Sequence, residues 1–133
     1  MKKVMLALIL LAVVTVAAVP LSANAEDLSA AQQKILKSTG VPVYPGSTYT
    51  TGDNEIATVL WFSTTDSPDK IMAWYEKKLS GWSVLVLNGS KVLYKGPKGM
   101  VAKDLSSKPY IFAEAKHEIP DDTEVEITIR IPK

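Results

Sequence analysis

Acidic side chains concentrate near the C-terminal end of the chain, where they could bind calcium or transfer protons. Calcium takes about six to eight oxygen ligands, often from alternating residues of one loop. These acids do not follow the D-x-[DN]-x-[DN]-G loop pattern, and a turn followed by a solvated strand face accounts for them. We therefore expect no metal site in this stretch. Its acids are Glu114, Glu118, Asp121, Asp122, Glu124 and Glu126.

Other catalytic patterns are missing from the sequence. His117 is the only histidine and there is no cysteine, so neither a histidine-rich metal site nor a thiol nucleophile can form. No G-x-S-x-G, P-loop or dinucleotide-binding pattern occurs. Paired carboxylates could serve a small acid-dependent hydrolase, which is the enzymatic alternative. The sequence favours a protein that binds over one that catalyses, and it predicts no cofactor.

The strongest candidate for binding is the segment 96–108, which is rich in glycine, proline, serine and lysine. Long irregular loops in compact domains are often binding elements. Its lysines and a methionine could meet an anionic ligand or membrane surface, and a solvated flexible loop is the structural alternative. Two tyrosines in loop-like sequence could add aromatic contacts. The candidate binding surface is Lys95, Lys98, Met100, Lys103, Lys108, Tyr44 and Tyr49.

Residues 1–25 have the three-part layout of a secretory signal peptide. A basic head precedes an apolar run over 4–19, and Ala23-Asn24-Ala25 provides a small-residue cleavage site. The apolar run is slightly shorter than the ~20 residues that a membrane-spanning helix needs. We expect cleavage and a destination in the periplasm, or alternatively release outside the cell. No stable membrane anchor is expected after cleavage.

Removal of this segment would leave residues 26–133, a length typical of one domain. The whole chain carries a formal charge of +1 at pH 7, and the loss of Lys2 and Lys3 makes it slightly negative. Nucleic acid is therefore not an expected partner. Because there is no cysteine, lipid attachment through a thiol cannot occur, and core packing must stabilise the domain without disulfides.

Two helices are expected. Asp27 can cap a short helix over Leu28–Ser38, and Gly40 fits its C-terminal stop. A second helix over 68–79 follows Asp66-Ser67, with a proline in its first turn, lysines in its last turn and Gly81 at its end. An apolar stripe at helical spacing predicts that one side of this second helix packs against a core.

The remaining segments alternate as strands. Asn88-Gly89 separates two apolar runs, which is a strong signal for a hairpin with a two-residue turn. In Glu55–Thr64 both alternating sets, including Ile56 and Trp61, are apolar, so we expect a central strand covered on both faces. The other predicted strands are 47–51, 82–87, 90–95, 110–117 and 124–131. The expected fold is α+β, one mostly antiparallel sheet of about five to six strands with helix 68–79 packed on it and a short N-terminal helix.

Two segments of the chain contain short motifs that resemble those of other proteins. Val43-Tyr44-Pro45-Gly46-Ser47 precedes the stretch 62–68, and Trp74-Tyr75-Glu76-Lys77-Lys78-Leu79 precedes Gly81-Trp82. This order resembles small exported bacterial proteins of unknown function with a YPG(A/S) element, a T-x-D-S helix start and a (F/W)Y-x-x-x-L…GW helix end. The resemblance covers about residues 41–87. It implies a compact α+β envelope domain and supplies no catalytic residue.

These observations predict an exported, non-enzymatic envelope protein that acts as a binding or interaction module. Its partner would be an envelope protein, a polymer or an anionic ligand that the sequence does not identify. The alternatives are the small acid-dependent hydrolase and a structural subunit of an envelope assembly.

Overall fold

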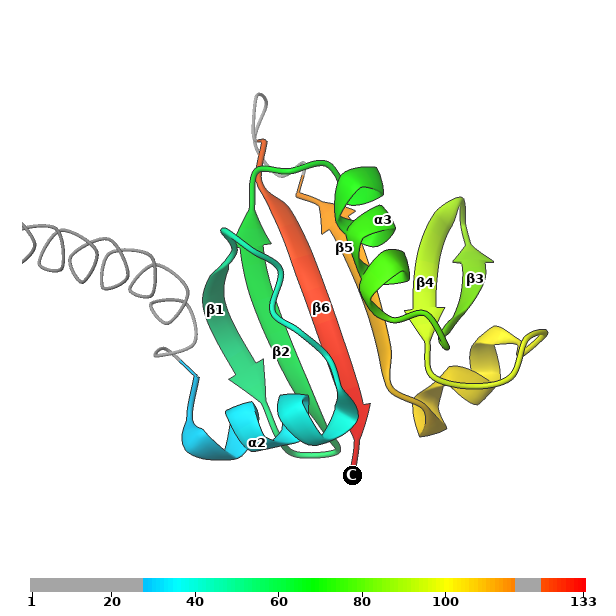
Figure 1. Ribbon diagram of the computed structural model, residues 1–133, viewed down its shortest axis with the longest axis horizontal. Coiled ribbons are helices and arrows are strands. Elements are labelled where there is room, and N and C mark those ends of the chain that lie inside the picture. The colour runs from blue at the N-terminus through cyan, green and yellow to red at the C-terminus, as the bar shows by residue number, and fades with distance from the viewer. Residues whose placement is uncertain (1–27, 117–122) are drawn as a thin grey trace, which may run out of the picture.

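The computed structural model describes residues 28–116 and 123–133, and in it six antiparallel strands form one sheet. The strand order is β1-β2-β6-β5-β4-β3, and both α-helices lie on the same face of the sheet (Figure 1). The predicted α+β class and sheet are therefore confirmed. The strands are β1 (Thr48–Asp53), β2 (Ala57–Thr64), β3 (Ser83–Leu87), β4 (Ser90–Tyr94), β5 (Tyr110–Ala115) and β6 (Val125–Pro132).

The C-terminal strand β6 lies in the middle of the sheet, between β2 and β5. It pairs with β2 from Ala57↔Pro132 to Thr64↔Val125, and with β5 from Tyr110↔Arg130 to Ala115↔Val125. Strands β1 and β2 form one antiparallel pair, and β3, β4 and β5 form a second antiparallel group. Strand β6 therefore joins two parts of the sheet that are built from different regions of the chain.

The sequence of β6 explains which face carries the helices. Its isoleucines and one valine alternate with polar residues, and the apolar set is buried against the helices. The same core includes Leu36 from α2 (Ala30–Thr39) and Ile71, Met72 and Tyr75 from α3 (Pro68–Lys78). The helix-bearing face is therefore the main core of the protein. The apolar residues of β6 in this core are Val125, Ile127, Ile129 and Ile131.

Helix α3 begins as the sequence predicted. The Ser67 hydroxyl accepts a hydrogen bond from the backbone N–H of Lys70 at 3.2 Å, and Pro68 occupies the first turn. Lysines fill the last turn, where the helix dipole favours positive charge. The helix ends at Lys78 with Leu79 as its C-terminal cap, so the expectation that Gly81 ends the helix was wrong.

Helix α2 begins two residues later than predicted. Ser29 caps it through a reciprocal capping box with Gln32, whose side chain accepts a hydrogen bond from the backbone N–H of Ser29. The predicted cap, Asp27, lies outside the described residues. Gly40 ends the helix with a φ of 81°, a left-handed conformation that glycine adopts without steric cost, as expected.

The hairpin between β3 and β4 is confirmed. Asn88 and Gly89 have φ angles of 50° and 80°, as a two-residue turn of the primed type requires. The segment that follows β4 was predicted to be an irregular loop. It contains a short 3₁₀ helix, η1 (Ala102–Ser107). This helix packs on the face of the sheet opposite the two α-helices.

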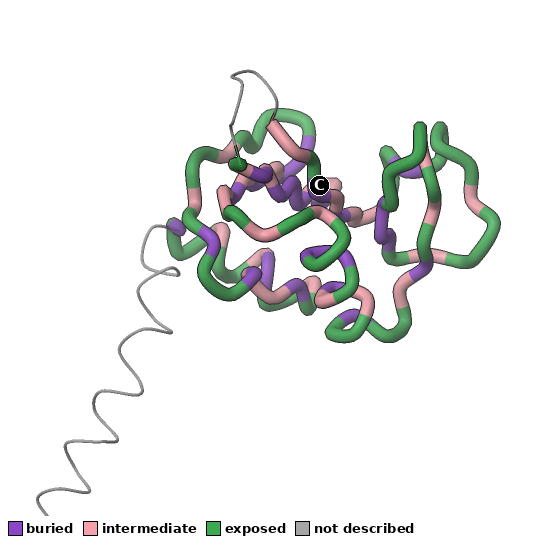
Figure 2. Tube along the Cα trace, turned by 90° about the horizontal axis from the view of Figure 1, so that it is seen from above, coloured by how far each residue is buried: buried purple, intermediate pink, exposed green. Residues whose placement is uncertain are grey.

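The prediction that strand 55–64 is covered on both faces was wrong. Ile56 is 83% exposed in the turn before β2, because β1 continues through Asp53 and shifts the turn toward the C-terminus. Val59 and Trp61 point away from the helices and are only half-buried. Buried residues occur along β2, β4, β5 and β6, whereas β1 has none, and exposed residues run along most connections (Figure 2). We call the face of the sheet that has no α-helix the open face.

Replacing Ile127 should test the role of β6 in the main core. Ile127 is fully buried, so Ile127→Ala should lower the free energy of unfolding by about 2–5 kcal/mol, through lost burial and a residual cavity. Urea denaturation of residues 26–133 measures this change. The matched control, Glu126→Ala, alters the neighbouring open-face residue and should cost less than about 1 kcal/mol. Equal losses would contradict the assignment of the two faces.

Candidate functional site

The open face contains a groove of about 500 Å³, which we call the outer groove. This volume lies within the ~300–1,000 Å³ typical of small-molecule sites. The groove lies over β4 and β5 and extends to the β3–β4 hairpin, to η1 and to one residue of β6. Its lining residues are Leu87, Asn88, Ser90, Val92, Ala102, Leu105, Ser106, Tyr110, Phe112, Ala113, Glu114 and Arg130.

The floor of the groove is apolar and aromatic. Tyr110 and Phe112 are two residues apart on β5, so both side chains point to the open face. Their ring centroids lie 6.2 Å apart with an angle of 20° between the planes. Val92 is the direct partner of Phe112 on β4 and is buried beside it. A ligand resting here would contact carbon atoms over most of its lower surface.

The 3₁₀ helix η1 forms one wall, because a small second core holds it against the sheet. Leu105 packs with Val92 and Tyr94, and all three are buried. The hydroxyl of Tyr94 donates a hydrogen bond to the carbonyl oxygen of Pro97 at 2.6 Å, and this contact ties the start of the connection to β4. The wall is therefore held by side-chain packing and a hydrogen bond, and Ala102 and Ser106 face the groove from it.

Among the described residues that line the groove, Arg130 is the only basic one. It is the direct β6 partner of Tyr110, and its guanidinium carbon lies 5.6 Å from the centroid of that tyrosine ring. Its Nη1 donates a hydrogen bond to the carbonyl oxygen of Ser106 at 2.9 Å. Arg130 thus joins the central strand to the η1 wall and brings a positive charge to one end of the groove.

The predicted lysine surface lies beside the groove and not inside it. Lys95, Lys98 and Lys103 are exposed, Lys108 is half-buried, and none of these four lysines lines the groove. Met100 is half-buried and packs with the small core beneath η1. The segment 96–108 does form a rim of the groove, but through Ala102, Leu105 and Ser106.

The two predicted tyrosines lie on the helix-bearing side of the sheet. Tyr49 packs edge-to-face on Phe62, with 5.7 Å between ring centroids, and its hydroxyl accepts a hydrogen bond from Gln32 at 3.2 Å. Tyr44 is 4% exposed and belongs to the main core, where it packs against Trp74. The fold therefore does not bring these tyrosines together with the lysines.

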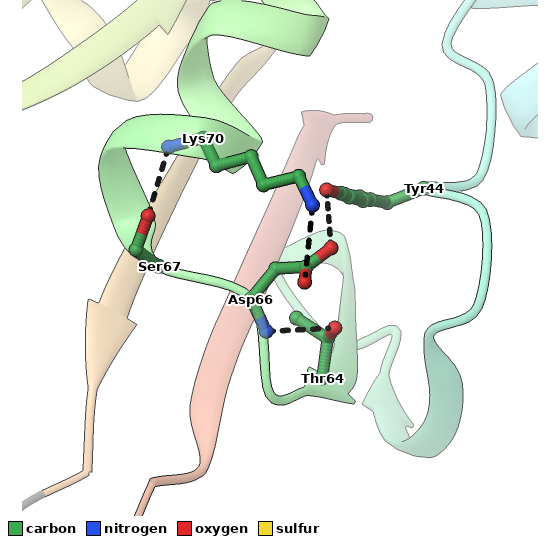
Figure 3. Close-up of polar contacts among 5 residues, drawn as sticks. All are labelled: Tyr44, Thr64, Asp66, Ser67 and Lys70. Atoms are coloured by element: carbon green, nitrogen blue, oxygen red, sulfur yellow. Dashed lines mark hydrogen bonds and ion pairs between the residues drawn. The ribbon is translucent and has the colours of Figure 1, made fainter.

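Tyr44 forms a polar contact at the start of α3 (Figure 3). Its hydroxyl donates to Oδ2 of Asp66 at 2.6 Å, and Nζ of Lys70 lies 3.5 Å from Oδ1 of the same carboxylate. Burial, aided by the hydrogen bond to Asp66, raises the pKa of Tyr44 to about 12. The hydrogen bond from Tyr44, with the nearby charge of Lys70, lowers the pKa of Asp66. We read this cluster as a structural tie between the segment before β1 and α3.

Several predicted features lie outside the described residues. They are the signal peptide, His117, and the acids Glu118, Asp121 and Asp122. Within residues 28–116 and 123–133, no three acidic or histidine side chains gather as metal ligands would. Across the same part of the chain, no helix has both the length and the apolar character needed to span a bilayer.

Comparison with protein-family models, curated proteins and solved structures finds no match to this chain.

The sequence offered only partial signals for the groove. In β5, Tyr110, Phe112 and Glu114 are each two residues apart. This spacing predicts that the two aromatic side chains share the face opposite Ile111. Arg130 is likewise visible as a polar residue alternating with isoleucines. Their proximity depends on the register in which β6 pairs with β5, and the alternation within each strand does not specify that register.

Alkaline pH should weaken the fold through Tyr44. The unfolded phenol has a pKa of about 10, so between about pH 10 and 12 the unfolded chain loses this proton while the folded chain keeps it. Stability therefore falls as pH rises through this window. Tyr44→Phe removes the group, so its free energy of unfolding should fall less steeply than that of the wild type between pH 9 and 11.5. Urea denaturation across that range measures both slopes, and parallel curves would contradict the assignment.

Proposed function

We propose that this chain is an exported binding module without catalytic activity, and that its binding site is the outer groove. The export signal in residues 1–25 supports a place of action in the periplasm. The observation that carries the proposal is the stacked pair of Tyr110 and Phe112 at the floor of a ligand-sized groove. Half-exposed aromatic side chains lining a concave surface are typical of ligand sites in proteins.

The lining chemistry favours binding over catalysis. One acid, Glu114, and one base, Arg130, line the groove, and they belong to different ends of it. Glycosidase-type hydrolysis uses two carboxylates on either side of the reacting bond. Among the described residues, the lining of the outer groove has one carboxylate, a polar rim and an apolar floor, which favours a binding site over the acid pair of a hydrolase.

Blocking the groove should abolish the binding of a neutral apolar probe. N-phenyl-1-naphthylamine should bind residues 26–133 saturably with a rise in fluorescence. Ala102 is exposed on the η1 wall, so Ala102→Trp fills the groove without disturbing the core and should weaken the affinity by at least about tenfold.

The control for this measurement is Ala73→Trp, which adds the same indole to an exposed position of α3 on the opposite face. Its affinity for the probe should match that of the wild type. Unsaturable binding, or equal affinity in the wild type and Ala102→Trp, would rule out the groove as the site.

A second candidate function, a structural subunit of an envelope assembly, is favoured by the edge strand β3. In β3 the side chains of Val84 and Val86 are 44% and 60% exposed, and the strand carries no charged residue. The other edge strand, β1, is interrupted by an irregularity between Tyr49 and Thr51. Bulges and charges are the usual protection of sheet edges, and β3 has neither.

A second copy of the same strand could pair with β3 in antiparallel fashion, since such an interface is self-complementary about a two-fold axis. We expect the mass of residues 26–133 in solution to rise with concentration. Val86→Lys places a charge on the edge and should restore the monomer, whereas Thr51→Lys on β1 should leave the association unchanged. Light scattering coupled to size exclusion measures these masses. A wild type that stays monomeric at every concentration would exclude this candidate.

A further inference from the structure

We propose that the outer groove takes an amphipathic carboxylate, a ligand with one apolar body and one carboxylate group, and that Arg130 binds the carboxylate. This inference rests on the proposed binding function of the groove. It adds the chemical class of the ligand and the direction in which the ligand lies.

Arg130 is held in place without having its charge neutralised. The ring of Tyr110 lies under the guanidinium, and the Ser106 carbonyl oxygen accepts a hydrogen bond from Nη1. Among the described residues, no acid forms an ion pair with Arg130. A guanidinium has five N–H donors, and one of them is used in that hydrogen bond. A fixed guanidinium that retains its charge and four of its five N–H donors is therefore available at the groove.

The shape of the guanidinium favours a carboxylate as its partner. Its planar fork matches the two oxygens of a carboxylate, and the paired hydrogen bonds are charge-assisted. A neutral carbonyl or hydroxyl group cannot use both donors in the same way. Packing against Tyr110 also restricts the guanidinium before binding, so less conformational freedom is lost when an anion arrives.

The distribution of charge in the groove gives the ligand a direction. Arg130 pairs with Tyr110, whereas Glu114 lies four residues further along β5, which corresponds to about 13 Å along a strand. Glu114 would repel a negative group placed near it. The carboxylate of the ligand should therefore lie at the Arg130 end, and its uncharged part should extend toward Glu114.

The surface between these two ends fits the apolar body of such a ligand. Phe112 and Val92 supply the floor, while Leu105 and Leu87 approach from the η1 wall and the β3–β4 hairpin. All four side chains are hydrocarbon. Phe112 and Leu87 are half-buried, so a body that covers them would remove apolar surface from water on both partners, and this removal favours association.

The test is displacement of N-phenyl-1-naphthylamine from residues 26–133 by matched pairs of competitors. Decanoate is compared with decanol, and 2-naphthoate with 2-naphthol, at pH 7 and below the concentrations at which they aggregate. The carboxylate should compete at least about tenfold better than its uncharged analogue in one or both pairs. The pair with the larger ratio tells whether the groove prefers an aliphatic or an aromatic body.

Arg130→Gln tests the residue itself, because glutamine is uncharged but can still donate to the Ser106 carbonyl. Saturable binding of the neutral probe to this variant shows that the groove persists. Within the variant, the preference for each carboxylate over its uncharged analogue should disappear, and this ratio does not depend on the variant's affinity for the probe. Arg130→Lys keeps the charge without the fork and should retain part of the preference. The control Lys108→Gln removes a cation from the lysine surface and should leave the preference unchanged.

The outcomes separate this inference from the proposed function. Displacement of the probe by both members of a pair with equal affinity would overturn the carboxylate assignment and leave the groove as a binding site. Failure of every competitor to displace a bound probe would also overturn it. A carboxylate preference that survives in Arg130→Gln would show that another residue provides the charge. Loss of probe binding in the wild type itself would remove the groove, and the inference with it.

Discussion

The insertion of β6 between β2 and β5 is the constraint on which the rest of the structure depends. Eight residue pairs join β6 to β2, and six join it to β5. Without this strand, the β1–β2 pair and the β3–β4–β5 group would have no hydrogen-bonded connection. The alternation of apolar and polar residues in β6 also sets which face is dry, since a shift of one residue in register would turn every side chain to the opposite face. The alternation of apolar and polar residues in β6 thus determines which face of the sheet forms the main core and which face remains open.

The two faces of the sheet are stabilised in different ways. Helices α2 and α3 cover one face with a continuous apolar core. The open face has only η1 and a small core around Val92, Tyr94 and Leu105. Tyr110 and Phe112 consequently remain half-exposed next to the small core that η1 covers. The outer groove exists because η1 is too short to cover the β5 surface up to the hairpin, and Arg130 sits where the covered and uncovered parts meet.

Polar contacts at the borders of the main core hold its covering segments in place. The Tyr44–Asp66 hydrogen bond links the segment after α2 to the start of α3, and the hydroxyl of Tyr75 donates to the carbonyl oxygen of Pro42 at 3.0 Å. The two tyrosines contact each other and Trp74 through their rings. Aromatic side chains here combine apolar burial with a hydrogen bond at the rim, which fixes the path of a chain segment that has no regular secondary structure of its own.

The sequence by itself determined those features that depend on neighbouring residues. The cap and proline at the start of α3, the left-handed glycine after α2, the turn at Asn88-Gly89 and the alternation of β6 all follow from local backbone and side-chain preferences. The predicted start of α2 and the predicted end of β1 were wrong, because in each case a neighbouring residue pattern prevailed. The capping box of Ser29 and Gln32 displaced the predicted cap at Asp27, and the extension of β1 through Asp53 moved Ile56 into an exposed turn.

Only the tertiary structure decided the strand order, the face on which the helices lie and the position of the groove. Sequence alternation shows that Tyr110 and Phe112 share a face, but it does not show that Arg130 lies beside them, because that contact depends on the register of β6 against β5. Likewise, the basic composition of 96–108 identified a surface segment, whereas the packing of Leu105 decided that its apolar residues line the groove. Pairing and packing are non-local, and for that reason the candidate site became visible only in the folded chain.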